Sequence, residues 1–234
     1  MHLVLSGEGN SDLGKISYAS TEFIPASMYY LIDKIIEQKL SYSFYETCPD
    51  SITFIPKIKL GEIAKELKKG KKLKIPHTGK KSKKETAYFL VNAITLAYIA
   101  KEKSEKLADE VIAILFRDSD GTCSTSKGMW EDKVISIENG FKLGNFTKGI
   151  AMVPKPKSEA WLLCALKKTP YINCNTLENR SGNDNSENPL KEELEALSIE
   201  YSEINEMIKN GSIDITKIDM SSFKAFYTKL NALL

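Results

Sequence analysis

Three acidic side chains follow two apolar runs of the chain. Residues 2–6 (HLVLS) lead into Glu8, and residues 111–116 (VIAILF) lead into Asp118 and Asp120. Residues two apart on an extended chain point to the same side, so Asp118 and Asp120 can converge on one ion. Carboxylate oxygens are the hard ligands that Mg²⁺ prefers, with water and substrate phosphate completing its octahedral shell. The spacing therefore predicts a site for Mg²⁺ or Mn²⁺, to which Glu8 adds a ligand or a proton carrier.

The same acids also suit ordinary turns. Aspartate is common where a strand ends, and Gly121 directly after Asp120 favours a turn. The DSDG run alone does not separate the two interpretations. Its pairing with a Gly-Glu-Gly turn after the first apolar run favours the metal site.

Apolar runs and helical stripes alternate along the chain. The unbroken run 111–116 is typical of a strand in the middle of a parallel sheet covered on both faces. Residues 23–39 carry apolar side chains at helical spacings of three and four. Strands that alternate with helices predict an α/β fold with an open, mostly parallel, Rossmann-like sheet. Further expected elements are strands at 52–55 and 149–153 and helices at 85–103, 127–138, 159–168 (capped by Ser158), 189–210 and around Phe223, Phe226, Leu230 and Leu233.

Ligands of open parallel sheets bind just beyond the carboxyl ends of the strands, which is where the acids fall. With 234 residues, of which 42% are hydrophobic and 27% charged, the chain fits one large globular domain spanning 1–234. The polar, Asn-rich segment 173–188 is expected to be a mobile loop, and residues 189–234 to form C-terminal helices.

The spacing of the cysteines and the length of the apolar stretches indicate the cellular compartment. The four cysteines, at 48, 123, 164 and 174, show no C-x-x-C spacing, which favours reduced thiols over disulfides or a zinc site. The N-terminal segment has no basic leader. The longest apolar stretch, 88–100, is shorter than the roughly 20 residues of a membrane span. A cytoplasmic protein without a membrane partner is therefore expected.

Segment 57–84 is rich in lysine. It holds twelve lysines against Glu62 and Glu66, a local charge of +10 in a chain of net charge +2. Such density predicts attraction to the phosphates of DNA or RNA, and lysine rather than arginine favours contact with the backbone over base recognition. The alternative is a solvated surface. The candidate nucleic-acid contacts are Lys68, Lys69, Lys71, Lys72, Lys80, Lys81, Lys83 and Lys84.

Four motifs resemble those of a known family. LVLSGEGNSD (3–12) and AILFRDSDG (113–121) resemble the Toprim signature of topoisomerases, primases and overcoming-lysogenization-defect nucleases, a strand ending in Glu-Gly and a later strand ending in Asp-x-Asp. PKPKSEAWLL (154–163) and the closing Ser-Phe-x-x-Phe (222–226) are similar to small bacterial Toprim-like proteins of mostly uncharacterised function. Glu8 and Asp118 lie 110 residues apart, more than a compact Toprim domain needs, so residues 40–84 are expected to be an insertion.

The resemblance implies roles for the acids. Glu8 would be a general acid/base or a metal ligand, while Asp118 and Asp120 hold magnesium. Asp12, four residues after Glu8, is a further candidate for the acidic cluster.

The helix motif adds candidates with competing explanations. Glu159 is a candidate ligand, although an acid in the first turn of a helix is also favoured by the helix dipole. Lys155 and Lys157 could steady a phosphate or the developing charge, or be solvated loop lysines. Trp161 is expected in the core, and Arg117 has no partner identifiable from the sequence.

These expectations combine into a metal-dependent nuclease, or a related phosphodiester-transfer enzyme, acting on DNA or RNA. Family association adds bacterial phage defence and a protein partner in a multi-component system. One alternative is a haloacid-dehalogenase-like phosphatase, with Asp118 as nucleophile, Asp120 as general acid, and a late acidic pair for which Asp214 and Asp219 are available. That alternative assigns no role to Glu8. Another is a module that binds nucleic acid or protein without catalysis.

Overall fold

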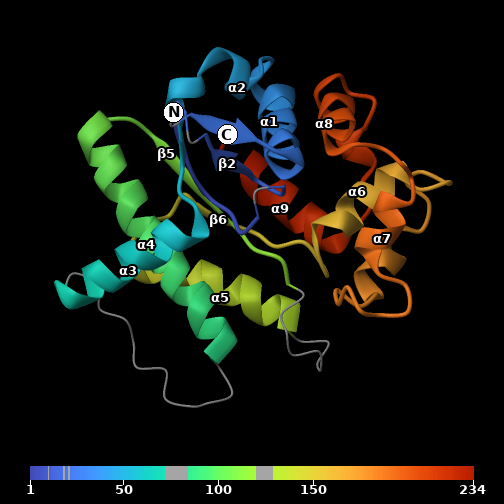
Figure 1. The fold of residues 1–234 in the computed structure, drawn as a ribbon. Helices are drawn as coiled ribbons and strands as arrows, with labels where there is room; N and C mark the ends of the chain where they lie inside the picture. The colour runs from blue at the N-terminus through green and yellow to red at the C-terminus, as the bar shows by residue number, and fades with distance from the viewer. Residues whose placement is uncertain (10, 18, 21, 72–83, 120–128) are drawn as a thin grey trace.

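A four-stranded parallel sheet forms the centre of the computed structural model, which describes all residues except 10, 18, 21, 72–83 and 120–128 (Figure 1). Its strand order is β4 (Ile52–Phe54), β1 (His2–Ser6), β5 (Val111–Phe116) and β6 (Gly149–Met152), and each neighbouring pair is parallel. The two central strands are buried along their whole length, as their apolar runs predict. The expected α/β class with a helix-flanked parallel sheet is confirmed.

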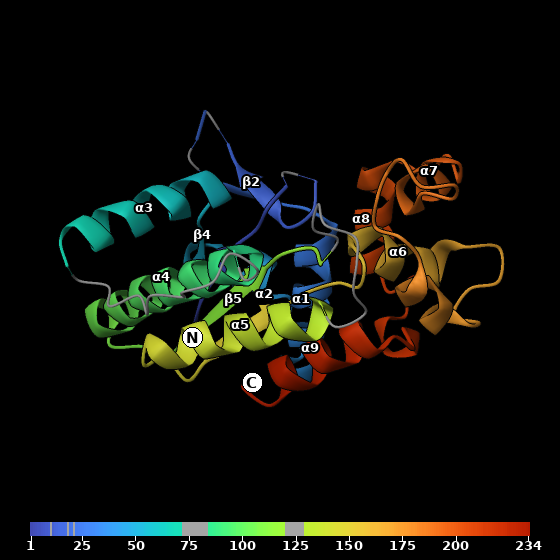
Figure 2. The same ribbon diagram turned by 90° about the horizontal axis from the view of Figure 1, so that it is seen from below.

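Helices cover both faces of the sheet. On one face lie α3 (Lys57–Lys69), α4 (Lys84–Leu107) and α5 (Met129–Leu143), which pack on Val4 and Leu115. On the other lie α1 (Ser27–Leu40), α6 (Ser158–Leu166) and α9 (Ser221–Asn231), which pack on Leu5 and Ile114. Figure 2 shows α3, α4 and α5 together at one end of the molecule, away from α6 and α7. Successive strand residues point to opposite faces, so each strand contributes to both cores.

Two expected boundaries move where short strands form. The helix predicted from residue 23 begins at Ser27, because Phe23–Pro25 is strand β3 and pairs with β2 (Gly14–Ile16) in an antiparallel hairpin. The stretch 40–84, expected as an insertion, contains α2 (Phe44–Thr47), η1 (Pro49–Ser51) and β4. Because β4 is an edge strand of the central sheet, part of this stretch belongs to the sheet itself.

The C-terminal part differs from its prediction in two places. The single helix expected over 189–210 is wrong: the chain forms α7 (Leu190–Glu195) and α8 (Tyr201–Lys209), separated by a turn in which Ser198 has φ 55°. Segment 173–188, expected as a mobile loop, contains η3 (Cys174–Asn179) with Glu178 buried. Glu178 accepts a hydrogen bond from the Ser222 backbone N–H (2.7 Å), which ties this segment to α9. A further 3-10 turn, η4 (Ile215–Lys217), precedes α9.

In the part of the chain that the structure describes, no helix has the length and apolarity needed to cross a membrane.

Candidate active site

The carboxyl ends of β1, β5 and β6 lie at one edge of the sheet because the three strands are parallel. Glu8 comes two residues after β1, and Asp118 comes two residues after β5. The chain that leaves β6 begins α6 at Ser158. The structure therefore brings Glu8, Asp118 and the start of α6 to the same edge, while Asp120 lies outside the described residues.

Ser158 joins three acidic side chains. Its backbone N–H donates to Asp118 Oδ1 (2.9 Å), and its hydroxyl lies 2.9 Å from Asp12 Oδ1 and 3.3 Å from Glu159 Oε2. A serine hydroxyl has one proton to donate, so Asp12 and Glu159 compete for it. Ser158 was expected to cap α6, but Lys157 occupies the cap position and Ser158 is the first helical residue.

Burial changes the acidity of this cluster. It raises the pKa of Asp12, and the charge of Glu8 adds to the effect, whereas Ser158 and nearby lysines oppose it. Burial likewise raises the pKa of Glu159, with a further contribution from Asp12. The pKa of Tyr201 is raised to about 12 by burial and by the neighbouring Glu159 and Asp12. Both acids are thus costly to keep ionised without a nearby cation.

Glu8 has a different environment, formed by two cations. Lys57, the first residue of α3, places its Nζ 2.9 Å from Glu8 Oε2. Arg117, directly before Asp118, places its Nε 3.5 Å from Glu8 Oε1 and is fully buried. The sequence offered no partner for Arg117, because Glu8 lies 109 residues earlier and meets it only through the pairing of β1 with β5.

The candidate lysines of the helix motif lie in two settings. Lys157 is nearly buried and donates to Asp184 Oδ1 (2.6 Å), and its charge lowers the pKa of Asp12 and of Glu159. Lys155 turns towards α5, where its Nζ lies 3.9 Å from Glu131 Oε1 and 5.6 Å from the centre of the Trp130 ring. Of these two lysines, Lys157 is therefore the one whose charge acts on Asp12 and Glu159.

Sequence reasoning missed a buried lysine beside the site. Lys133 on α5 is fully buried and its ammonium donates to the Ser119 carbonyl, between the two aspartates of the DSD motif. A signal was present in the sequence: Lys133 lies on the helical stripe of Ile137 and Phe141, where an apolar residue is expected.

The lysine-rich segment is described in part. Lys68, Lys69 and Lys71 are exposed at the end of α3 that lies away from Glu8. Lys84 begins α4. Outside the described residues fall Lys72, Lys80, Lys81 and Lys83.

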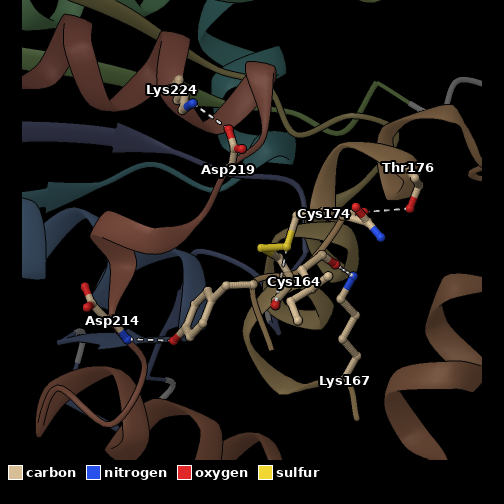
Figure 3. The surroundings of a disulfide bond; sticks show 10 residues. Cys164, Lys167, Cys174, Thr176, Asp214, Asp219 and Lys224 are labelled. Carbon is tan, nitrogen blue, oxygen red and sulfur yellow. Dashed lines mark hydrogen bonds and ion pairs between the residues drawn. A yellow bond between two sulfur atoms is a disulfide. The ribbon is translucent and has the colours of Figure 1, made fainter. Parts of the chain in front are cut away.

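A disulfide corrects the expectation of reduced cysteines. Cys164 on α6 is bonded to Cys174 at the start of η3 (Figure 3). The spacing of ten residues gave no motif, but the chain turns back after α6, where the Tyr171 N–H donates to the Cys164 carbonyl (2.7 Å). Both cysteines are buried, and Cys48 is a free thiol. The bond ties α6, which carries Ser158 and Glu159, to the segment that follows it.

The core expectation for Trp161 is confirmed. Its side chain is fully buried and packs on Phe223 and Phe226, and its Nε1 donates to Ser222 Oγ (2.8 Å). The last two motifs of the resemblance to Toprim-like proteins, the Glu-Ala-Trp helix and the Ser-Phe-x-x-Phe helix, thus pack directly on each other.

The donor chemistry of the acidic cluster fits a hard cation. Asp12, Asp118 and Glu159 supply carboxylate oxygens, the ligand type that Mg²⁺ and Mn²⁺ prefer, and a cation would offset the cost of ionising Asp12 and Glu159. Among the described residues, no three histidine, cysteine or acidic side chains already form a compact metal-binding group.

Comparison with protein-family models, with curated proteins and with solved structures gives no match for this chain.

Proposed function

We propose that the protein is a Toprim-type, magnesium- or manganese-dependent nuclease, or a related phosphodiester-transfer enzyme, acting on DNA or RNA. The observation that carries the proposal is the gathering of Glu8, Asp12, Asp118 and Glu159 at the carboxyl edge of a parallel sheet. This edge is where open parallel sheets bind ligands. The motif resemblance, which is carried by the same residues, also supports the proposal.

Each residue has a role that follows from its surroundings. Asp118, Asp12 and Glu159 would hold the metal ion, with Asp120 as a further candidate ligand. A bound ion would supply Lewis-acid polarisation of the phosphate and a more acidic water. Glu8 would move a proton to or from the reacting oxygen. Lys157 would stabilise negative charge next to the acidic cluster.

The lysines of α3 suit the nucleic-acid backbone. The helix begins at Lys57, which contacts Glu8, and carries the exposed Lys65, Lys68 and Lys69 away from the site. A nucleic-acid strand whose phosphates contact these lysines would be directed towards Glu8. A role in phage defence with a protein partner is part of the same proposal and rests on family resemblance.

The phosphatase alternative is disfavoured by the late acids. Asp214 contacts Thr216 and Lys217, and Asp219 contacts Lys224. Figure 3 shows both acids in the surroundings of the disulfide, on the segment that leads into α9. Their carboxylates are engaged in these local contacts, whereas the phosphatase mechanism needs a late acidic pair beside Asp118.

The test is cleavage of plasmid DNA and of single-stranded RNA by purified protein with Mg²⁺ or Mn²⁺. We expect cleavage that chelation abolishes, and loss of about 100-fold or more in Glu8→Gln, since a positioned acid/base contributes at least that factor. Glu62→Gln is the matched control, because Glu62 is an exposed acid paired with Lys59 on α3. Hydrolysis of a small phosphomonoester that survives Glu8→Gln would indicate the phosphatase. Binding of nucleic acid with no cleavage under any metal condition would indicate the non-catalytic module.

A further inference from the structure

Several buried polar atoms at the carboxyl ends of β1 and β5 lack a hydrogen-bond partner. Within the described part of the chain they are Ser6 Oγ and the Nε and Nη2 atoms of Arg117. Both side chains point to the face covered by α3, α4 and α5, because Val4 and Leu115, two residues earlier on each strand, pack into that core. Proteins satisfy nearly all of their buried polar atoms, so orphaned donors at one place indicate a missing acceptor.

Helix α4 adds to this group. It packs over β1 and β5, and its Tyr88 lies close enough to the Arg117 guanidinium to act on it electrostatically. Asn92 lies one helical turn after Tyr88 on the same side of the helix, is buried, and also has no partner for its Nδ2 among the described residues. The unsatisfied atoms of Arg117 and Asn92 are donors, so the missing group accepts hydrogen bonds.

Charge points to the same conclusion. Glu8 is one carboxylate between two cations, with Lys57 Nζ at 2.9 Å and Arg117 Nε at 3.5 Å. Glu8 is the acidic group that acts on the Arg117 guanidinium in the described structure. Among the described residues this group therefore carries one positive charge more than negative, and Arg117 is the cation withdrawn from solvent. A buried cation is stabilised by further hydrogen-bond acceptors.

Three side chains near the Arg117 guanidinium are partly exposed. Glu8 is 28% exposed and Lys57 41% exposed, and the Lys57 ammonium lies 5.6 Å from the centre of the Tyr88 ring. Tyr88 itself is 40% exposed. Rotation of these side chains requires no change in the strands, so a ligand can approach the Arg117 guanidinium from their side. Side-chain rotations of this kind are fast.

We propose that Arg117, with Ser6, Asn92 and Lys57, forms an oxyanion subsite that binds a phosphate group of the substrate. The inference rests on the proposed function and deepens it. The phosphate oxygens would accept hydrogen bonds from Arg117 Nε and Nη2 and from Lys57 Nζ, a geometry that suits a guanidinium. Phosphate would thereby take both cations away from Glu8. The carboxylate of Glu8 is then freed next to the phosphate, where it can accept a proton from the attacking water.

The test uses inorganic phosphate as the probe, with chelator present and ionic strength held constant with sodium chloride. Binding is measured by calorimetry and by the rise in thermal unfolding temperature. We expect phosphate to bind the wild-type protein, Lys57→Gln to weaken binding and Arg117→Gln to abolish it. Glu8→Gln should bind phosphate about tenfold more tightly, because the competing carboxylate is gone. Lys59→Gln, two residues further along α3 and paired with Glu62, should bind as the wild type does.

The Glu8→Gln arm decides the proposal if Arg117→Gln fails to fold. Unchanged or weaker phosphate binding in Glu8→Gln overturns the subsite, since Arg117 would then be only the counter-ion of Glu8. The absence of phosphate binding to the wild type overturns it as well. These failures are distinct from failure of the proposed function. Metal-dependent cleavage without tighter phosphate binding in Glu8→Gln would contradict the subsite but not the nuclease. Tighter phosphate binding in Glu8→Gln without any cleavage would contradict the nuclease but not the subsite.

Discussion

Two sides of one sheet edge have opposite electrostatic character. On the side of α6, Asp12, Asp118 and Glu159 gather around Ser158. On the side of α3 and α4, a single acid, Glu8, is held by two cations. We call these the acid side and the cation side. Arg117 and Asp118 are adjacent in sequence yet fall on opposite sides, because successive residues of an extended chain point in opposite directions.

The difference shows how one strand end can supply both halves of a site. The acid side carries an excess of carboxylate that burial makes costly to ionise, so it suits a cation. The cation side leaves a buried guanidinium incompletely paired, so it suits an anion. A phosphodiester with a bound metal ion presents both charges. Variants that affect one side and spare the other therefore test whether the two sides are separate.

The largest expected effect comes from Asp118→Asn on the acid side. Asparagine keeps an oxygen to accept the Ser158 N–H but removes the charge, so the fold should persist while metal-dependent cleavage falls by about 100-fold or more. Phosphate binding on the cation side should be unchanged. Asp132→Asn, an exposed acid in the first turn of α5, is the control. If Asp118→Asn lost phosphate binding as well, the acid side and the cation side would not bind their ligands independently.

Removing the disulfide should destabilise the protein and weaken metal binding on the acid side, without affecting the cation side. Cys174→Ser opens a closure over ten residues and is expected to lower the free energy of unfolding by about 2.5 kcal/mol, as loop-closure entropy predicts. Chemical denaturation measures this, with Cys48→Ser, a change at a free thiol, as the control. Because α6 carries Ser158 and Glu159, metal affinity should fall in Cys174→Ser while phosphate binding stays. Equal stability of the two cysteine variants would contradict the expectation.

A smaller effect is expected from lysines beyond the cation side. Replacing Lys68 and Lys69 with glutamine should weaken duplex DNA binding about tenfold and lower the slope of log affinity against log salt by about 1.8, since each phosphate contact contributes about 0.9. Replacing Lys101 and Lys106 removes the same charge near the far end of α4 and serves as the control. Binding titrations over a range of salt give the slopes. Identical slopes for the two double variants would show that the end of α3 is a solvated surface.

The smallest effect is expected at the opposite end of β1. His2 is buried against Thr53 Oγ1 (2.8 Å), and burial, aided by Lys103, lowers its pKa from 6.5 to about 4. Between these values the unfolded chain binds a proton that the folded protein does not, so stability should fall as pH drops from 6.5 to 4 and level off below. The drop is on the order of 1 kcal/mol after allowance for solvent screening.

Substituting the histidine isolates this contribution. His2→Asn should flatten stability over that pH range in denaturation curves, with phosphate and metal binding unaltered, since His2 is remote from both sides. A pH dependence identical to that of the wild type would assign the effect to other groups.

Much of the frame follows from local sequence pattern. The apolar runs before Glu8 and Asp118 are strands, the alternation of strands and helices is a parallel α/β sheet, and both acids fall at its carboxyl edge. These features are predictable because strand ends and helical stripes depend on residues close together in the chain. The helix over 189–210 was mispredicted because Pro189 and Gly211 mark its outer ends, whereas the turn at Ser198 has no glycine or proline to mark it.

Local sequence pattern is enough to place Glu8 and Asp118 at the ends of two strands. What each of these acids contacts depends on how the strands and helices pack together. The pairing of β1 with β5 sets Arg117 against Glu8, the start of α6 brings the Ser158 hydroxyl between Asp12 and Glu159, and the return of the chain after α6 joins Cys164 to Cys174. Contacts across such separations depend on strand register and on which helix covers which face, and no local pattern encodes either.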